Sequence, residues 1–176
     1  CGSGIIEVVA EMYLAGVITV DGIIDGSLTN KTARVVEDGR TFSYVLHVDE
    51  NETNNLQSQS SILITQNDIR QIQLAKAALY AGVKLLMDKL AIEKIDRIRL
   101  AGAFGSHISV RHAMILGLIP DCVLDQVSSA GNAAGTGARI ALLNQHSRGM
   151  IEKLVMEIEK IETAMEPRFQ EYFVDA

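Results

Sequence analysis

Two clusters of small residues most constrain what this chain can fold into. Residues 98–105 read IRLAGAFG, a short apolar run that leads into two glycines around an Ala-Phe pair. This pattern predicts a buried strand entering a tight turn onto a helix, where Gly102 and Gly105 let backbone N–H groups approach a ligand. Taken alone, the motif fits equally well a strand-to-helix connection that binds nothing. A second cluster, GNAAGTGA at 131–138, favours one nucleotide pocket with a hinge behind it.

Composition and charge restrict the class of protein. With 176 residues, 48% of them apolar, the chain can bury a sizeable core and suits one layered α/β domain or one lobe of a larger protein. The net charge of −6 and the lack of a basic stripe argue against nucleic acid or an anionic membrane surface as a partner. No apolar run approaches the roughly 20 residues of a membrane span. The two cysteines, Cys1 and Cys122, give no disulfide framework or metal pattern, so we expect a cytoplasmic protein.

The predicted elements alternate between helices and strands. In residues 1–60 we expect a helix that ends near Gly16, a hairpin with strands at 33–36 and 41–48 joined by Asp38-Gly39, and an exposed loop at 50–60. In residues 61–176 we expect strands at 61–64, 95–101, 122–127 and 158–163, and helices at 65–90, 110–118, 131–144, 147–157 and 166–173. Strands followed by helices indicate a sheet with some parallel order. The expected fold is therefore α/β, with a mixed central sheet of about five strands and helices on both faces.

The longest predicted helix carries two candidate ligand contacts. It opens with a capping box at Thr65 and Asp68, with Asp in the place usually taken by Glu or Gln. Its expected apolar stripe consists of Ile69, Ile72, Leu79, Val83, Leu86 and Leu90, widened by Leu74, Ala75, Ala78 and Ala81. Lys76 interrupts that stripe and should either extend to the helix edge or meet an acidic partner or an anion. Gln73 lies one turn earlier on the same face; the alternative for both residues is an ordinary solvated side chain.

Other chemistry finds little support in the sequence. Of the four histidines, His107 and His112 are five residues apart, which does not place both on one helix face for zinc. Cys122 is expected to be a small core residue. The acidic run at 152–162 is expected to be a solvated helix face rather than a docking surface. No Walker A motif, nucleophile elbow or paired carboxylates occur, so we assign no catalytic and no metal-binding residue.

Several longer motifs resemble one known family. They are CGSGII at the start, TQNDIRQIQLAKAALYAG at 65–82, IDRIRLAGAFG at 95–105, ILGLIPD at 115–121, GNAAGTGARIAL at 131–142 and IEKIETAMEPRFQEYFVDA at the end. In this order, over nearly the whole chain, they are similar to the C-terminal part of the ATP-dependent reductive activators of corrinoid proteins. The resemblance implies that residues 1–176 are a fragment, one lobe of an actin-like ATPase of the acetate and sugar kinase, chaperone and actin (ASKHA) superfamily. Residues 61–176 would form its nucleotide-binding core.

The resemblance also implies a function for a longer parent protein. Such activators use ATP with Mg²⁺ to help drive an electron from a two-iron, two-sulfur cluster to an inactive Co(II) corrinoid, giving Co(I). The partner would be a corrinoid protein or a corrinoid-dependent methyltransferase, with the upstream lobe and the ferredoxin domain as further partners and a homodimer as one assembly. In physical terms, ATP would stabilise a conformation in which the cobalt is easier to reduce.

The resemblance assigns three groups of candidate site residues. The adenosine loop would be Gly102, Ala103, Phe104 and Gly105. The small-residue helix at the hinge between lobes would hold Gly131, Asn132 and Gly135. The helix that borders the adenosine pocket would supply Gln73 and Lys76 to the ribose or the base.

The sequence also departs from the family pattern. The Asp-Gly-Thr type phosphate loops and the four cysteines with CxxxxCxxC spacing are absent, so we expect this chain alone to bind no iron–sulfur cluster and not to hydrolyse ATP. Two alternatives stay open. The chain could be a module for dimerisation or for docking the corrinoid protein, with weak nucleotide binding, or a lobe of another ASKHA member such as a sugar kinase or a reactivating factor.

Overall fold

The first helix, α1 (Gly2–Leu14), supplies one wall of the core. The computed structural model describes residues 2–48 and 61–176, so the loop predicted at 50–60 lies outside the described residues. Ile6, Val9 and Ala10 are buried on one side of α1, because residues three or four apart share a helix face. Gly16 follows the helix with φ +72°, which fits its predicted role of ending it.

An antiparallel three-stranded sheet lies beside α1. Its strands are β1 (Val35–Asp38), β2 (Thr41–His47) and β3 (Ile62–Thr65), in the order β1-β2-β3. The predicted hairpin is confirmed, since Asp38 pairs with Thr41 and Gly39 takes φ +62° in the turn between them. The main core cluster joins this sheet to the helices and consists of Val9, Met12, Ile18, Ile24, Val35, Ile64 and Ile69.

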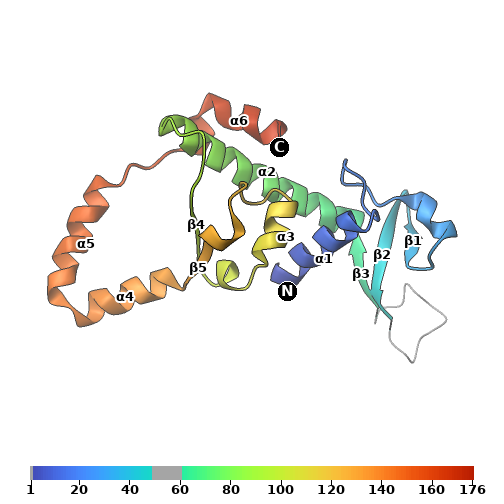
Figure 1. Cartoon of the computed structure of the whole chain (residues 1–176), viewed down its shortest axis with the longest axis horizontal. Helices are drawn as coiled ribbons and strands as arrows, with labels where there is room; N and C mark the ends of the chain where they lie inside the picture. The colour runs from blue at the N-terminus through green and yellow to red at the C-terminus, as the bar shows by residue number, and fades with distance from the viewer. Residues whose placement is uncertain (1, 49–60) are drawn as a thin grey trace.

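The helix α2 (Gln66–Lys89) is the longest helix described and runs from the three-stranded sheet, where it contacts β2 and β3, to the C-terminal helix near residue 170 (Figure 1). Its capping box is confirmed: the Asp68 N–H donates to Thr65 Oγ1 at 3.1 Å, and the Thr65 N–H donates to Asp68 Oδ2 at 2.8 Å. The predicted apolar stripe is partly wrong. Ile69 is buried, but Leu79 and Leu86 are 50% and 49% exposed. The other buried residues of α2 are Ala77, Ala81 and Leu85. The short side chains of the two alanines let neighbouring elements approach the helix closely.

A second, parallel sheet pairs β4 (Ile98–Ala101) with β5 (Val127–Gly131). The α/β class with five strands is confirmed, but the strands are divided between two sheets and do not form one central sheet. The strand predicted at 122–127 is wrong, since Leu124–Gln126 forms a 3-10 turn and pairing with Ile98 begins only at Val127. The apolar residues at 122–127 suggested a buried strand. The strand that forms, β5, is mostly exposed, so apolar side chains did not mark its position.

The connection between β4 and β5 contains α3 (Val110–Ile115), which packs on α1 through Ile6, Ala113 and Leu118. Cys122, expected in the core, is only half-buried, and its Sγ lies 3.5 Å from the Asp96 carbonyl oxygen.

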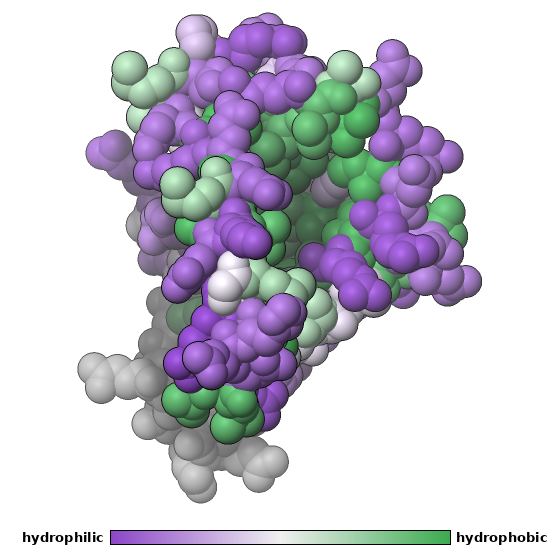
Figure 2. Space-filling view, turned by 90° about the vertical axis from the view of Figure 1, so that its left-hand side faces the viewer, coloured by the Kyte–Doolittle hydropathy of each residue, from purple (hydrophilic) through white to green (hydrophobic). Residues whose placement is uncertain are grey.

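The last third of the chain leaves the body and returns to it. The helices α4 (Ala133–Leu143) and α5 (Gln145–Glu157) form an arm in which no residue is buried (Figure 1). Seen from the side where this arm lies, the surface is hollowed and apolar side chains line the hollow (Figure 2). The strand predicted at 158–163 is wrong: none of the described strands includes these residues, and a 3-10 turn, Thr163–Met165, follows.

The helix α6 (Pro167–Val174) then docks on the end of α2. Arg168 Nη1 lies 2.6 Å from Asp88 Oδ2, and Lys89 Nζ lies 2.6 Å from Glu166 Oε1. The Tyr172 hydroxyl also donates to Asp88, and this hydrogen bond is the main cause that raises the pKa of Tyr172. No helix in the described part of the chain is both long and apolar enough to cross a bilayer.

Candidate functional site

The two glycine clusters meet at the carboxyl ends of the parallel strands. The Gly102 N–H, just after β4, donates to the carbonyl oxygen of Gly131, the last residue of β5, at 2.8 Å. Both glycines have positive φ, +99° for Gly102 and +63° for Gly131. Ligands of parallel sheets bind at this end of the strands, because the loops and helix N-termini gather there.

The backbone at this edge is open. A Cβ atom added at Gly102 or at Gly131 would meet no other heavy atom within 4 Å. The glycines are therefore required here by their backbone angles, since an L side chain rarely adopts these φ values, and not by packing within the chain. The free space leaves the backbone accessible to a ligand from outside.

The residues predicted for the hinge cap the N-terminus of α4. Asn132 Oδ1 accepts the N–H of Gly135 at 2.9 Å and caps the helix. A Cβ at Gly135 would lie 2.7 Å from Asn132 Nδ2, so Gly135 is the position that makes room for the cap. Asn132 and Gly135 thus shape the start of α4, directly after Gly131.

Two serines fix the edge and were missed in the sequence. Ser106 Oγ donates to the Gly102 carbonyl oxygen at 2.9 Å, and Ser129 Oγ accepts the Gly131 N–H at 3.1 Å. The two hydroxyls are 3.3 Å apart, so they link the two glycine loops. In the sequence, Ser106 lies four residues after Gly102 and Ser129 lies two residues before Gly131. This spacing indicates a role for the serines only when the pairing of β4 with β5 is known.

Phe104 and Gly105 continue the loop after Gly102 and contact β4 and the start of α1. A Cβ at Gly105 would lie 3.1 Å from the carbonyl carbon of Leu100, so the turn packs against its own strand. The Phe104 side chain is 53% exposed, and its ring would lie 3.3 Å from a Cβ at Gly2, at the start of α1. Both residues line a mostly apolar cavity of about 500 Å³ beside β4 and α2, while Ala103 is exposed between Gly102 and Phe104.

Gln73 and Lys76 lie at a different cavity. Gln73 Nε2 donates to the Asp21 carbonyl oxygen at 3.1 Å and covers Gly22, where a Cβ would meet it at 2.0 Å. The aliphatic part of Lys76 lies against Gly117. The two residues share a cavity of about 150 Å³ with parts of α1 and α2, so the structure brings them together with each other but not with Phe104 and Gly105.

The chemistry of this edge is that of a binding surface. It presents backbone amides and carbonyls, two hydroxyls and the N-terminus of α4, groups that orient a polar ligand without attacking it. Within residues 2–48 and 61–176, no group of three or more His, Cys, Asp or Glu side chains is placed to hold a metal ion. Among the described residues, Mg²⁺ therefore has no such cluster of side-chain ligands.

Comparison with known proteins places this geometry in a family. The family described as the C-terminal domain of RACo, the ASKHA domain, matches residues 1–176. The corrinoid activation enzyme RamQ of Eubacterium limosum is 34% identical over 182 residues, which cover 99% of this chain and 30% of that protein. A solved structure of a reductive activator for corrinoid, iron-sulfur protein superposes with a TM-score of 0.84 at 32% identity, covering 100% of this chain and 27% of that one. The chain thus spans less than a third of the length of these relatives, and it belongs to the family of RACo C-terminal ASKHA domains.

Proposed function

We propose that this chain is the nucleotide-binding C-terminal lobe of a longer cytoplasmic protein that uses ATP to activate a corrinoid protein reductively. The observation that carries the proposal is the open glycine edge. Gly102 and Gly131 meet there with positive φ and free space above the backbone, in a chain that matches an ASKHA domain along its whole length. The names of the two relatives, a corrinoid activation enzyme and a reductive activator for a corrinoid, iron-sulfur protein, support the corrinoid as the target.

In this proposal the residues of the chain hold the nucleoside. The adenosine lies against the backbone at Gly102 and Ala103, while Gly131, Asn132 and Gly135 set the direction of the helix α4 behind it. The lobe outside this chain contacts the phosphates and the Mg²⁺ ion. ATP then changes the parent protein because it binds one arrangement of the two lobes more tightly than the other.

Gln73 and Lys76 have a more limited role in the proposal. They border the 150 Å³ cavity on the α1 side of α2, and Gln73 is already engaged by the Asp21 carbonyl. Because both residues lie at a cavity separate from the glycine edge, their part in binding is secondary to that of the edge.

Calorimetric titration of ATP with Mg²⁺ tests the proposal, in this chain and in a parent protein that contains the preceding lobe. The test variant is Gly102→Ala, and the matched control is Gly16→Ala, because both glycines have positive φ and neither has a heavy atom within 4 Å of an added Cβ. We expect weaker binding only in Gly102→Ala, with circular dichroism unchanged. Equal affinities for both variants would contradict an adenosine site at this edge.

A second candidate function is a module for dimerisation or for docking the corrinoid protein. The observation in its favour is the α4–α5 arm, whose exposed apolar side chains include Leu143, Leu154 and Met156. Sedimentation of the parent protein and of Leu154→Glu would distinguish the two roles, since only the assembly role predicts that the substitution changes the oligomeric state while ATP binding persists.

A further inference from the structure

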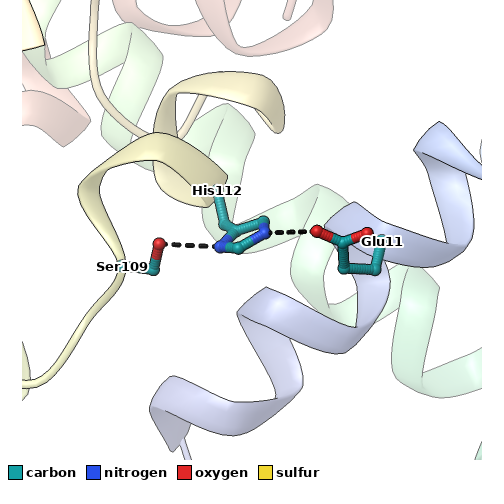
Figure 3. Close-up of polar contacts among 3 residues, drawn as sticks. All are labelled: Glu11, Ser109 and His112. Atoms are coloured by element: carbon teal, nitrogen blue, oxygen red, sulfur yellow. Dashed lines mark hydrogen bonds and ion pairs between the residues drawn. The ribbon is translucent and has the colours of Figure 1, made fainter.

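A polar chain of three residues ties α3 to α1 (Figure 3). Ser109 Oγ lies 2.7 Å from His112 Nδ1, and His112 Nε2 lies 2.8 Å from Glu11 Oε1. The His112 side chain is 15% exposed and that of Glu11 62%, so the imidazole is the enclosed member of the chain. Glu11 and His112 are 101 residues apart in the sequence, so this contact links two segments that only the fold brings together.

The hydrogen-bond roles follow from the chemistry of the three groups. The Glu11 carboxylate can only accept, so His112 Nε2 carries the proton that it donates. Ser109 can either donate to the neutral Nδ1 or accept from a protonated one, because its hydroxyl rotates. Ser109 occupies the N-cap position of α3, yet its side chain makes no capping hydrogen bond.

The same helix α1 also supports the adenosine loop. The Phe104 ring lies against Gly2 at the start of α1, and Glu11 lies nine residues later, about 13 Å along the helix axis. The segment 104–112 is thus attached to α1 at both of its ends, by an aromatic contact and by the His112 link. Ile6 packs against Ala113 and Leu118 between these two points. Gly102 and its open backbone directly precede this segment.

We propose that Glu11, His112 and Ser109 form a positioning chain that holds α3 on α1 and thereby fixes Phe104 and the glycine loop. None of the three touches the nucleotide in this inference; they act through the loop. An effect of these three residues on ATP binding rests on the proposed function. Their effect on the position of Phe104 is independent of that function.

The test observes the loop directly by ¹⁹F NMR of the whole polypeptide labelled with 4-fluorophenylalanine. The chain has four phenylalanines, and Phe104→Leu identifies the resonance of interest. We expect His112→Leu and Glu11→Ala each to shift this resonance, and the double variant to shift it no further than the larger single change, because each substitution removes one of the two groups of the same hydrogen bond. Glu7→Ala on α1 and His146→Leu on α5 are the controls of matched charge and type, and they should leave it in place.

The serine gives a second, conservative test. Ser109→Thr keeps the hydroxyl and should retain the resonance, while Ser109→Ala should shift it, even though no capping hydrogen bond is lost. Because Glu11 is mostly exposed, Glu11→Ala remains informative if His112→Leu fails to fold. A Phe104 resonance that is unmoved in Glu11→Ala and Ser109→Ala, or that moves equally in Glu7→Ala, would overturn the proposal.

Nucleotide affinity separates this inference from the proposed function. If both hold, His112→Leu weakens ATP binding by up to about tenfold, the equivalent of one hydrogen bond to a charged group. A shifted Phe104 resonance with unchanged ATP affinity would support the positioning chain and count against an adenosine site at this loop.

Discussion

Alanine substitutions at Gly131 and at Gly39 should distinguish a loss of folding stability, caused by backbone strain, from a loss of ATP affinity. Gly131 has φ +63° and Gly39, in the β1–β2 turn, has φ +62°. A Cβ at either position would meet no heavy atom within 4 Å. Gly131→Ala and Gly39→Ala therefore impose the same perturbation on the chain itself, a left-handed residue with a side chain, at a cost of about 1–2 kcal/mol each.

The two variants should lose stability alike. For a domain of this size, a loss of about 1–2 kcal/mol lowers Tm by roughly 2–8 °C. The two sites are far apart in the fold, so the double variant should show the sum of the two changes. Scanning calorimetry of both single variants and of the double variant measures these shifts.

Only Gly131→Ala should affect the nucleotide. Its methyl group occupies free space at the residue that is hydrogen-bonded to Gly102, where the proposed adenosine lies, so we expect ATP affinity to fall by at least about tenfold, or 1.4 kcal/mol. Gly39→Ala should bind ATP as the wild type does. The assay is calorimetric titration in a parent protein whose wild-type binding is measurable.

Two results would refute this reasoning. Equal ATP affinities for Gly131→Ala and Gly39→Ala would mean that no ligand packs on the backbone at Gly131. An unchanged affinity together with slower ATP hydrolysis by the parent protein would assign Gly131 to the hinge alone.

Three further outcomes follow from other contacts. Gly105→Ala should destabilise the chain by about 1–3 kcal/mol, because the added Cβ would lie 3.1 Å from Leu100. Gly137→Ala should stabilise the chain by about 0.5–1 kcal/mol, because Gly137 lies inside α4 and an added Cβ there would meet no heavy atom within 4 Å. Thermal unfolding of the two variants measures both changes. Asp88→Asn should release α6, because it weakens both the ion pair to Arg168 and the hydrogen bond from Tyr172, which hydrogen exchange of 167–174 would report as faster exchange. The pKa of Tyr172 is raised above its ordinary value near 10 in the folded chain. Docking of α6 should therefore be retained below pH 10 and lost as the pH rises through the folded pKa of Tyr172. Tyr172→Phe should remove this alkaline transition in the exchange data.

Local signals in the sequence were sufficient where the chain determines its own conformation. The Thr65 and Asp68 side chains satisfy each other's backbone, so the start of α2 was predictable from four consecutive residues. The turn at Gly39 was predictable for the same reason, since a positive φ between two strands selects glycine. The glycine loops of the candidate site belong to this class, because their backbone angles are a property of the residues themselves.

Predictions failed where the outcome depends on partners distant in the sequence. The apolar run at 122–127 predicts a strand, but pairing with Ile98 selects 127–131, whose small and polar residues carry no strand pattern. The stripe predicted on α2 includes Leu79 and Leu86, which are half-exposed, whereas Ala77 and Leu85, outside that stripe, are buried. A helix can bury either face, and the choice between them lies in the neighbouring elements and not in the helix.

The same distinction explains which parts of the candidate site were visible in the sequence. Gly102 and Gly131 could be recognised one at a time, but the hydrogen bond between them exists only because β4 and β5 are parallel. The link from Glu11 to His112 gave no signal at all, since an isolated histidine is informative only together with what it contacts. A binding edge made of backbone depends on side chains elsewhere to keep its shape, and here those side chains come from a helix about a hundred residues earlier in the chain. Substitutions at Glu11 or His112 are therefore expected to alter the glycine loop without any change in the loop sequence.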